Sequence, residues 1–326
     1  MTIRRYVPKS APMPEHFTRR ILLQRAALSA AALLGGAGMP SLHAQESQRG
    51  TTRTIPLGDG LWLLSSDSGN SLLLATAGEA ALVDGSTAAE GRALQAAILQ
   101  AAGTVNVRYL VNSNWRPRHT GSNELFAATG ATIVAHENTR LWMGTDIEVQ
   151  WEQLSYPPSK PAALPTKTFY TDTELQLGGR VLRCGHAPRA HTDGDLHVHL
   201  PGNDLLFAGD LLAVGAYPIA DYVTGGWIDG LIAANESLLK LCGDATRIIP
   251  GKGSVQGRAQ LLAQLEMCRS VRERTVALMK QGLGLREIMA AAPTREFDAH
   301  WGDSALFLYL IYHGVIDHVR ETGGIG

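Results

Sequence analysis

The chain has 326 residues, of which 45% are hydrophobic and 18% are charged. This length and composition allow a large core, arranged as one large domain or two small ones. The formal net charge of -1 gives no basic surface for nucleic acid or for an anionic membrane, so neither is expected as a partner. The three cysteines, Cys184, Cys242 and Cys268, are far apart and form no C-x-x-C motif, so we expect core residues rather than a disulfide or ligands. The sequence does not specify an oligomeric state.

The N-terminus has the features of a targeting segment. Arg19 and Arg20 precede a weakly hydrophobic run, 26–39, which is rich in Ala, Leu and Gly. A paired arginine before such a run resembles a twin-arginine export signal. The run is short and Gly-rich for a transmembrane helix, although an uncleaved anchor is the alternative. We therefore predict a signal peptide over 1–44, a periplasmic location, and no stable membrane insertion after cleavage. The mature part, 45–326, is expected to form a single domain with a helical C-terminal part.

The first half of the mature chain predicts a β-meander followed by alternating helices and strands. Short apolar runs are separated by turns at Gly58-Asp59-Gly60 and at Gly78-Glu79. A segment with apolar residues at helical spacing follows. The expected strands are 52–57, 61–64, 70–74, 80–83, 105–111 and 131–135, and the expected helices are 89–99 and 123–129.

The second half repeats the order of strands and then helices. A proline-rich stretch, 156–165, predicts an extended connection. Two successive runs of strands followed by helix fit two layered halves that pack as a sandwich with helices outside. The expected strands are 168–169, 175–182, 197–200, 205–208 and 247–249, and the expected helices are 230–241, 260–281, 285–291 and 306–319.

Four loops with polar side chains each follow a predicted strand. They are 114–119, 186–195, 208–210 and 250–253. Together with Gly226-Trp227-Ile228-Asp229-Gly230 and the tail 297–302, in this order, they resemble the metallo-β-lactamase superfamily, and most closely a periplasmic branch of its hydrolases. The resemblance covers nearly all of the mature chain. It implies an α+β fold, a four-layer αβ/βα sandwich, and hydrolase activity that depends on two zinc ions.

The resemblance also assigns each ligand position. The family takes three His and one Asp from the first loop, a fourth His from the His-Thr loop, a bridging Asp, and a last His from Pro-Gly-His-Gly. These ligands suit Zn²⁺, which lowers the pKa of a bound water. Three positions are kept in this chain, as His119, His191 and Asp210. Four are replaced, by Asn114, Arg116, Arg118 and Lys252.

The replacements preserve charge rather than ligands. Two Zn²⁺ and two Asp carry a formal charge of +2, and three cations with Asp210 again give +2. Arginine cannot lose its proton to become a ligand. It also repels a nearby Zn²⁺, by roughly 4 kcal/mol per pair of unit charges at ~4 Å in an effective dielectric of ~20. We therefore expect that the dinuclear zinc site is lost, that no cofactor is bound, and that Asp210 pairs with one or more of the cations.

Four interpretations of this site remain open. In the first, the chain is a pseudoenzyme or binding protein that holds an anionic small molecule, such as a carboxylate or phosphate ester, by bidentate arginine contacts. The ligand-binding residues would then be Asn114, Trp115, Arg116, Arg118 and Lys252. Alternatively it is a metal-free hydrolase, with His119 or His191 as base and the arginines stabilising an oxyanion. In the third interpretation, Arg116, Arg118 and Lys252 only neutralise and fill the former site. A residual metal at the three kept positions, or a relocated one, is the fourth possibility; candidate ligands for the latter are His186, His191, His197, His199, Asp193 and Asp195.

Overall fold

The structure is a computed structural model that describes residues 52–103 and 106–322. The predicted signal peptide, 1–44, lies outside the described residues. The described chain divides into two compact units, a small one of residues 146–157 and a large one that contains the rest. The small unit is an antiparallel hairpin formed by β7 (Ile147–Val149) and β8 (Leu154–Tyr156). Everything below concerns the large unit.

The first sheet of the large unit has seven strands in the order β1-β2-β3-β4-β5-β6-β9. The first four strands form the predicted antiparallel meander, and β4, β5, β6 and β9 then pair in parallel. Their bounds are β1 (Arg53–Gly58), β2 (Leu61–Ser65), β3 (Asn70–Ala75), β4 (Ala80–Val83), β5 (Val107–Val111), β6 (Thr132–His136) and β9 (Lys167–Phe169).

The second sheet has five strands in the order β10-β11-β12-β13-β14. The first four pair antiparallel, whereas β13 and β14 are parallel. The turn predicted between the strands of the β12–β13 pair forms at the 3-10 helix η2 (Pro201–Asn203). The strands are β10 (Thr173–Leu177), β11 (Arg180–Ala187), β12 (Asp195–Leu200), β13 (Leu205–Gly209) and β14 (Arg247–Pro250).

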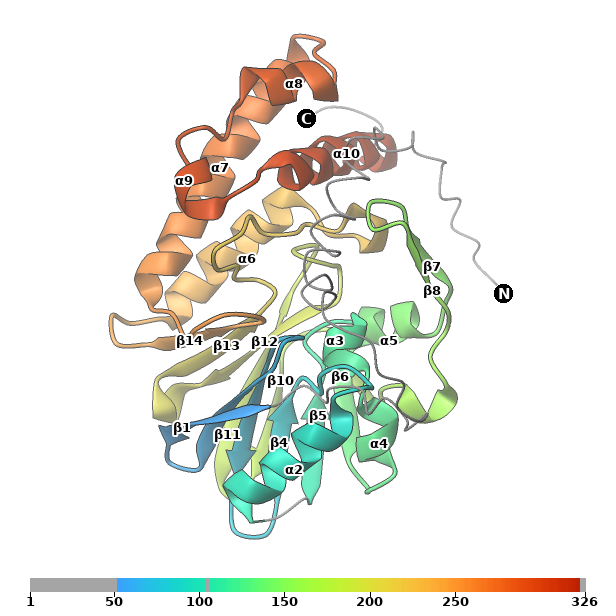
Figure 1. Cartoon of the computed structure of the whole chain (residues 1–326), viewed down its shortest axis with the longest axis vertical. Coiled ribbons are helices and arrows are strands. Elements are labelled where there is room, and N and C mark those ends of the chain that lie inside the picture. Colours follow the sequence, from blue (N-terminus) through green and yellow to red (C-terminus); the bar gives the residue numbers. More distant parts are fainter. Residues whose placement is uncertain (1–51, 104–105, 323–326) are drawn as a thin grey trace, which may run out of the picture. The chain divides into compact units, whose positions relative to one another are not determined.

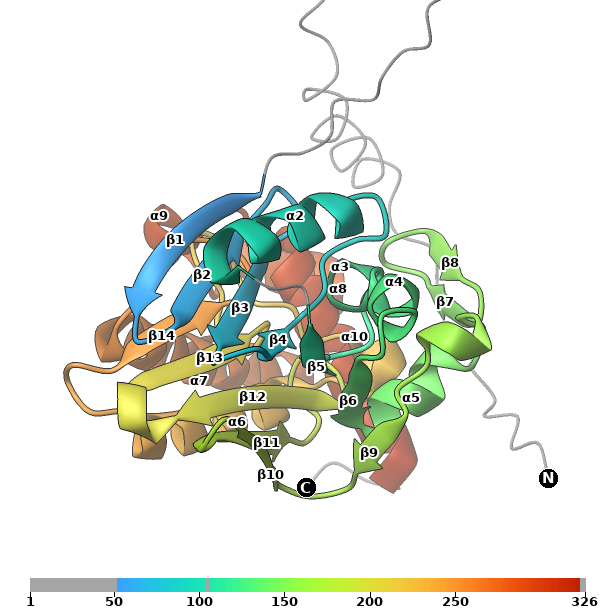
Figure 2. The same cartoon turned by 90° about the horizontal axis from the view of Figure 1, so that it is seen from below.

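The helices cover the outer faces of the two sheets, as Figures 1 and 2 show. On the first sheet lie α2 (Gly91–Ala102) and α4 (Asn123–Ala127), and on the second lie α6 (Ile228–Leu241) and α7 (Arg258–Lys280). The shorter helices are α3 (Pro117–Thr120), α5 (Glu137–Met143), α8 (Leu285–Ala291) and α9 (Asp298–Trp301), with 3-10 turns η1 (Pro161–Ala163) and η3 (Tyr222–Thr224). The last helix, α10 (Ala305–Thr322), packs on α7, α8 and η3.

Three apolar clusters correspond to the interfaces between these layers. One lies between the sheets and joins Val111 of the first to Phe207 of the second. The second lies between the first sheet and α2, around Ile98, and the third between the second sheet and its helices, around Leu231. Burial of such faces is the main favourable term in folding. This α+β arrangement is the four-layer αβ/βα sandwich that the sequence predicted.

The topology brings several loops to one edge of the sandwich. The parallel strands β4 and β5 both end at this edge, and so do β13 and β14 in the second sheet. Since β12 runs antiparallel to β13, it begins where β13 ends. The loops that carry the kept and the replaced ligand positions lie at these strand ends.

Two further expectations can be compared with the described residues. Cys184, Cys242 and Cys268 are free thiols in buried positions, as predicted. Within 52–103 and 106–322, no helix has the length and apolar character needed to cross a bilayer.

Candidate functional site

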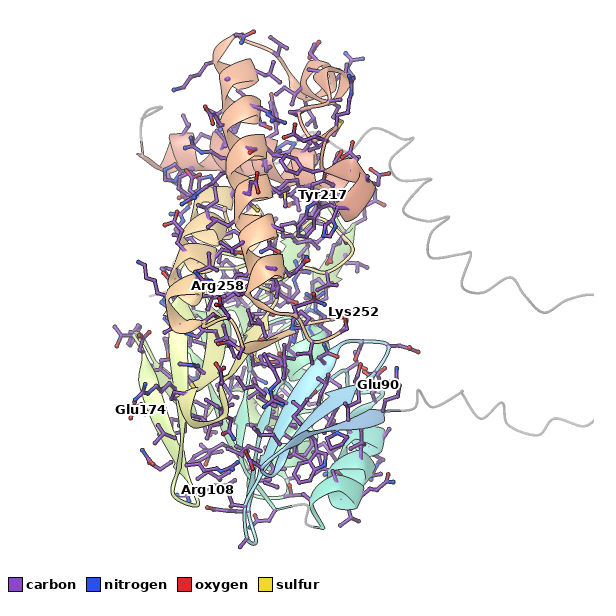
Figure 3. The ribbon with its side chains drawn as sticks, turned by 90° about the vertical axis from the view of Figure 1, so that its left-hand side faces the viewer. Glu90, Arg108, Glu174, Tyr217, Lys252 and Arg258 are labelled. Carbon is purple, nitrogen blue, oxygen red and sulfur yellow. The ribbon has the colours of Figure 1, made fainter. Side chains whose placement is uncertain are left out.

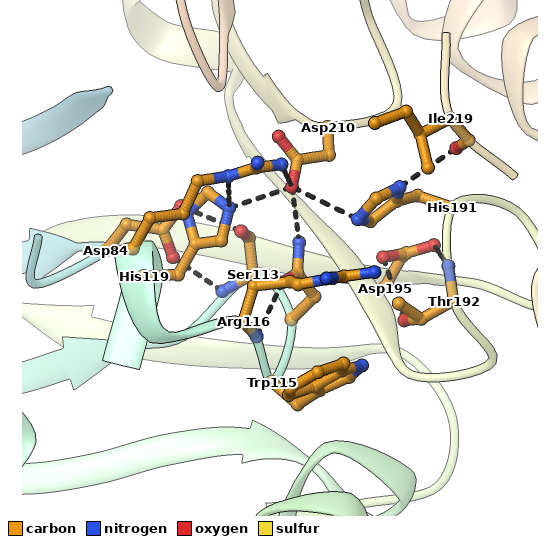
Figure 4. Close-up of polar contacts among 12 residues, drawn as sticks. Asp84, Ser113, Trp115, Arg116, His119, His191, Thr192, Asp195, Asp210 and Ile219 are labelled. Carbon is orange, nitrogen blue, oxygen red and sulfur yellow. Dashed lines mark hydrogen bonds and ion pairs between the residues drawn. The ribbon is translucent and has the colours of Figure 1, made fainter. Parts of the chain in front are cut away.

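Asp210, directly after β13, is the residue on which the polar contacts of the site converge (Figure 4). Its Oδ2 accepts hydrogen bonds from Asn114 Nδ2, at 2.9 Å, and from Arg118 Nη2, and it lies 2.8 Å from His119 Nε2. Burial acts to raise the pKa of Asp210. This effect is outweighed by the positive charges of Arg118 and His119 and by the nearby ring of His191. Together they hold the pKa of Asp210 well below its usual range.

His119, on α3, lies between two carboxylates (Figure 4). Its Nδ1 is 2.8 Å from Asp84 Oδ2, and its Nε2 is 2.8 Å from Asp210 Oδ2. Burial alone would lower the pKa of His119, but the two carboxylates outweigh it and raise the pKa to about 9. The imidazole is therefore protonated near pH 7. Arg118 Nε lies 2.9 Å from His119 Nε2. In the protonated ring, His119 Nε2 carries a hydrogen and donates it to Asp210 Oδ2.

Asp84, which sequence reasoning did not single out, holds His119 from the other side. It follows β4 and is fully buried, with a backbone φ of 63°. Its carboxylate accepts 2.7 Å hydrogen bonds from the backbone N–H and the hydroxyl of Ser113, which follows β5. A non-glycine residue at positive φ is uncommon and costs conformational energy. The ends of β4 and β5 are thus fixed together at the site.

Arg116 does not reach Asp210. Its Nη2 donates to Asp221 Oδ2 at 2.7 Å, with side-chain exposures of 5% and 0% for the two residues. Thr224 Oγ1 donates to the same oxygen at 2.8 Å, and Trp115 Nε1 donates to Thr224 Oγ1 at 3.1 Å. The guanidinium carbon lies 4.7 Å from the Trp115 ring centroid, within cation–π range. Trp115 and Arg116 therefore bind the first loop to η3, and Trp115 is itself buried.

Lys252, after β14, is exposed (Figure 3). Its ammonium donates a 2.8 Å hydrogen bond to the backbone carbonyl of Asp67 in the β2–β3 loop. Asn70 joins the same two loops, since its Nδ2 donates to the carbonyls of Pro250 and Gly253. Of the three cations at replaced positions, the structure brings Arg118 onto Asp210 and gives Arg116 and Lys252 other partners.

His191 lies in the β11–β12 loop with its ring close to Asp210 (Figure 4). Nδ1 donates to the Ile219 carbonyl at 2.8 Å, and Nε2 lies 3.4 Å from Asp210 Oδ2. Burial, together with the charges of Arg116 and Arg118, lowers the pKa of His191 to about 4, against the effect of Asp210. This ring is therefore neutral near pH 7, in contrast to that of His119.

The loop around His191 is held by its own residues and by α5. Asp195 accepts from the backbone N–H of Thr192 at 2.7 Å and from its hydroxyl at 3.0 Å, the structural role expected for it. Burial raises the pKa of Asp195 well above its usual range, against these hydrogen bonds. From α5, Thr139 Oγ1 donates to the Gly194 carbonyl at 2.9 Å, and Trp142 Nε1 donates to Asp193 Oδ1 at 2.6 Å.

The charges of the cluster balance internally. Arg116, Arg118 and protonated His119 face the carboxylates of Asp84, Asp210 and Asp221, three of each sign. The sequence-based count of +2 did not include Asp84 and Asp221, because nothing in the sequence linked them to the loop. The cluster is formally neutral. Gly251 packs on Asp210 Oδ1, and the next residue, Lys252, is exposed with its ammonium on the Asp67 carbonyl.

The residues present do not fit a pair of zinc ions. Among residues 52–103 and 106–322, no group of three or more His, Cys, Asp or Glu side chains is arranged to hold a metal ion. A guanidinium already lies on Asp210, and an arginine cannot lose its proton to become a ligand. The relocated set around His186 and His197 forms no such group either.

Comparisons with known proteins agree with this architecture. The family model described as the metallo-beta-lactamase superfamily matches residues 65–252. A solved metallo-beta-lactamase from Pontibacter korlensis is 19% identical, with a TM-score of 0.55 over 67% of this chain and 99% of its own. The DIM-1 metallo-beta-lactamase is 16% identical, with a TM-score of 0.53 over 67% of this chain and 97% of its own. No curated protein matches the chain. At these identities the structural likeness concerns the fold alone.

Proposed function

Since the chain belongs to the metallo-beta-lactamase superfamily, we propose that it is an exported member in which fixed positive charge takes the place of zinc. In this proposal it is not a dinuclear zinc hydrolase. It binds a small anionic molecule beside Arg118 and Lys252, and the site functions without a cofactor.

The observation that carries this proposal is the position of Arg118. Its guanidinium pairs with Asp210, the residue at the position of the bridging ligand, yet 35% of its side chain stays exposed. Nη2 and Nε face Asp210 and His119, and no described residue is recorded as a partner of Nη1. Arginine binds carboxylates and phosphates through charge-assisted hydrogen bonds, and exposed Lys252 adds a second positive charge at this edge.

The loss of zinc dependence is tested first, by elemental analysis of the protein purified from a zinc-supplemented culture. The expected content is well below one zinc per chain. Two zinc per chain, or zinc-dependent hydrolysis of a lactam, would overturn this part of the proposal. As a positive control, the four reversions Asn114→His, Arg116→His, Arg118→Asp and Lys252→His in one chain are expected to bind zinc.

Anion binding is tested by calorimetric titration of the mature, metal-stripped protein with propionate and with lactate. Arg118→Gln is expected to weaken binding of either carboxylate about tenfold, the effect of one lost charge-assisted hydrogen bond. Arg108→Gln is the matched control, because Arg108 also pairs with a carboxylate, that of Glu79, but lies far from Lys252 in Figure 3. If neither carboxylate binds, or if Arg118→Gln binds like the original chain, anion binding at Arg118 is wrong.

Export depends on residues 1–44, which lie outside the described residues. Arg19→Lys together with Arg20→Lys is expected to keep the chain in the cytoplasm, because the paired arginine is the feature that the export route recognises. Cell fractionation measures this directly. Unchanged periplasmic recovery of the double variant would exclude the twin-arginine route.

A further inference from the structure

The two carboxylate oxygens of Asp210 have different surroundings (Figure 4). Oδ2 accepts from Asn114 and Arg118 and lies against His119. No residue that the structure describes donates to Oδ1, and Oδ1 is not one of the fully buried polar atoms that lack a partner. Since 11% of the Asp210 side chain is exposed, this oxygen can accept a hydrogen bond from a ligand.

Gly251, after β14, keeps space open in front of Oδ1. A Cβ at this position would overlap Oδ1. The backbone of Gly251 is held on both sides, because its N–H donates to the Gly209 carbonyl at 2.7 Å and its carbonyl accepts from Asn70 N–H at 2.9 Å. The opening is thus built into the backbone and does not depend on a side-chain rotamer.

Arg118 places a donor next to the same ion pair. Nη2 contacts Asp210 Oδ2, whereas Nη1 has no partner among the residues that the structure describes, and 35% of the Arg118 side chain is exposed. Nη1 is bonded to the same carbon as Nη2, and Oδ1 to the same carbon as Oδ2. A positively charged donor and a negatively charged acceptor therefore flank a single contact.

A plain carboxylate at Arg118 has an unfavourable neighbour. It brings a negative charge close to that of Asp210, and carboxylates that share a site repel each other. An ammonium on the carbon next to the ligand carboxylate changes this balance, because it contacts Oδ1 through a charge-assisted hydrogen bond. The site therefore fits a ligand with both charges better than one with a negative charge alone.

We propose that Arg118 and Asp210 Oδ1 bind the carboxylate and the ammonium of one zwitterionic ligand, so that the site selects α-amino acids. This inference rests on the proposed carboxylate binding at Arg118. In an α-amino acid both charged groups are attached to one carbon, which matches a donor and an acceptor that flank one ion pair.

The test compares L- and D-alanine with propionate, which has a hydrogen in place of the ammonium, in calorimetric titrations of the mature, metal-stripped protein. At least one alanine enantiomer is expected to bind about tenfold or more tightly than propionate, because it gains a charge-assisted hydrogen bond. Equal binding of alanine and propionate, still dependent on Arg118, would overturn this inference and leave carboxylate binding intact. Binding of neither ligand would instead reject the proposed function itself.

Gly251→Ala fills the space at Oδ1 and leaves both charged residues in place. Its alanine affinity is expected to fall to the level of propionate, whereas propionate affinity stays unchanged and shows that the variant is folded. Gly257→Ala is the matched control with no expected change, because no atom lies within 4 Å of a Cβ at that position. A Gly251→Ala variant that still prefers alanine would contradict the role of Oδ1.

Asp210→Asn decides the matter if Gly251→Ala fails to fold. It keeps the shape of the side chain and removes its negative charge, so the ratio of alanine to propionate affinity is expected to fall to about one. Asp229→Asn, at a carboxylate that pairs with Arg272 on the outer helices, is expected to keep the ratio of the original chain. An unchanged ratio in Asp210→Asn would overturn the inference.

Discussion

Arg116 and Arg118 leave the same short loop, yet their guanidiniums lie in different surroundings. Arg116 is buried against an equally buried Asp221 and stacks on Trp115, so its pair joins two loops. Arg118 pairs with Asp210 but keeps a third of its side chain in contact with solvent. The two arginines therefore differ in their contacts: the buried one joins two loops, and the partly exposed one is the residue for which we propose anion recognition. What separates the two pairs is mainly the exposure of the arginine itself, 5% for Arg116 against 35% for Arg118.

The largest expected effect concerns the buried pair. Arg116→Met keeps the apolar stem but leaves the Asp221 carboxylate without its guanidinium, and we expect unfolding in urea to show a loss of about 3–5 kcal/mol. Arg108→Met removes an exposed pair instead, so the expected loss is far smaller than that of Arg116→Met. Similar losses of unfolding free energy in the two variants would show that burial of the arginine does not decide how much its ion pair stabilises the fold.

A double variant measures the interaction between Arg116 and Asp221 apart from the contribution of each residue alone. Asp221→Asn combined with Arg116→Met removes both charges, and the double variant is expected to be more stable than Arg116→Met alone, because no buried charge is left. If the two losses simply add, the residues do not interact energetically. The hydrogen bonds from Thr224 and Val223 to Asp221 would then account for its burial.

The second expected effect is a pH dependence from His119, which shares Asp210 with Arg118. The pKa of this ring is about 9 in the folded chain and about 6.5 when unfolded, so the charged form stabilises the fold. The contribution, of order 3 kcal/mol, is fully present below pH ~6.5 and is lost as the pH rises through about 9. Urea unfolding at intervals from pH 6 to 10 measures it, with His119→Gln as the variant that should flatten the curve. If stability rises over this range in the original chain but not in the variant, folding lowers the pKa of His119 instead of raising it.

The sequence predicted the sandwich because its apolar runs, turns and helices are regular enough to be located one by one. It also identified the loops at the site, since each follows a strand. It did not identify Asp84 or Asp221, because a single carboxylate carries no local pattern, and their roles depend on which loops meet in space. Nor did it indicate α5 or the β7–β8 hairpin, short elements within the connection after β6. The distribution of the cations among Asp210, Asp221 and the Asp67 carbonyl likewise follows only from the folded arrangement.

A third, smaller effect on stability is expected at Arg118. Arg118→Met removes one donor from Asp210, but Asn114 and protonated His119 still face that carboxylate, and the arginine is partly solvated. The expected loss is therefore about 1 kcal/mol, well below that of Arg116→Met. Carboxylate binding should weaken about tenfold in the same variant. A loss of stability as large as that of Arg116→Met, with ligand binding unchanged, would assign Arg118 a structural role and remove the difference between the two arginines.

The smallest effect is expected at Lys252, which tests whether recognition extends beyond Arg118. Its side chain is exposed and donates one hydrogen bond to the Asp67 carbonyl, so Lys252→Gln should change the free energy of unfolding by no more than about 0.5 kcal/mol. Lys160→Gln, at an exposed lysine that pairs with Glu124, is the control for loss of a surface charge. Carboxylate affinity should fall several-fold in Lys252→Gln and remain unchanged in Lys160→Gln, and the difference should shrink at high salt, because exposed charges are screened over about 10 Å at ~0.1 M ionic strength. Equal affinities in the two variants would confine the anion contact to Arg118.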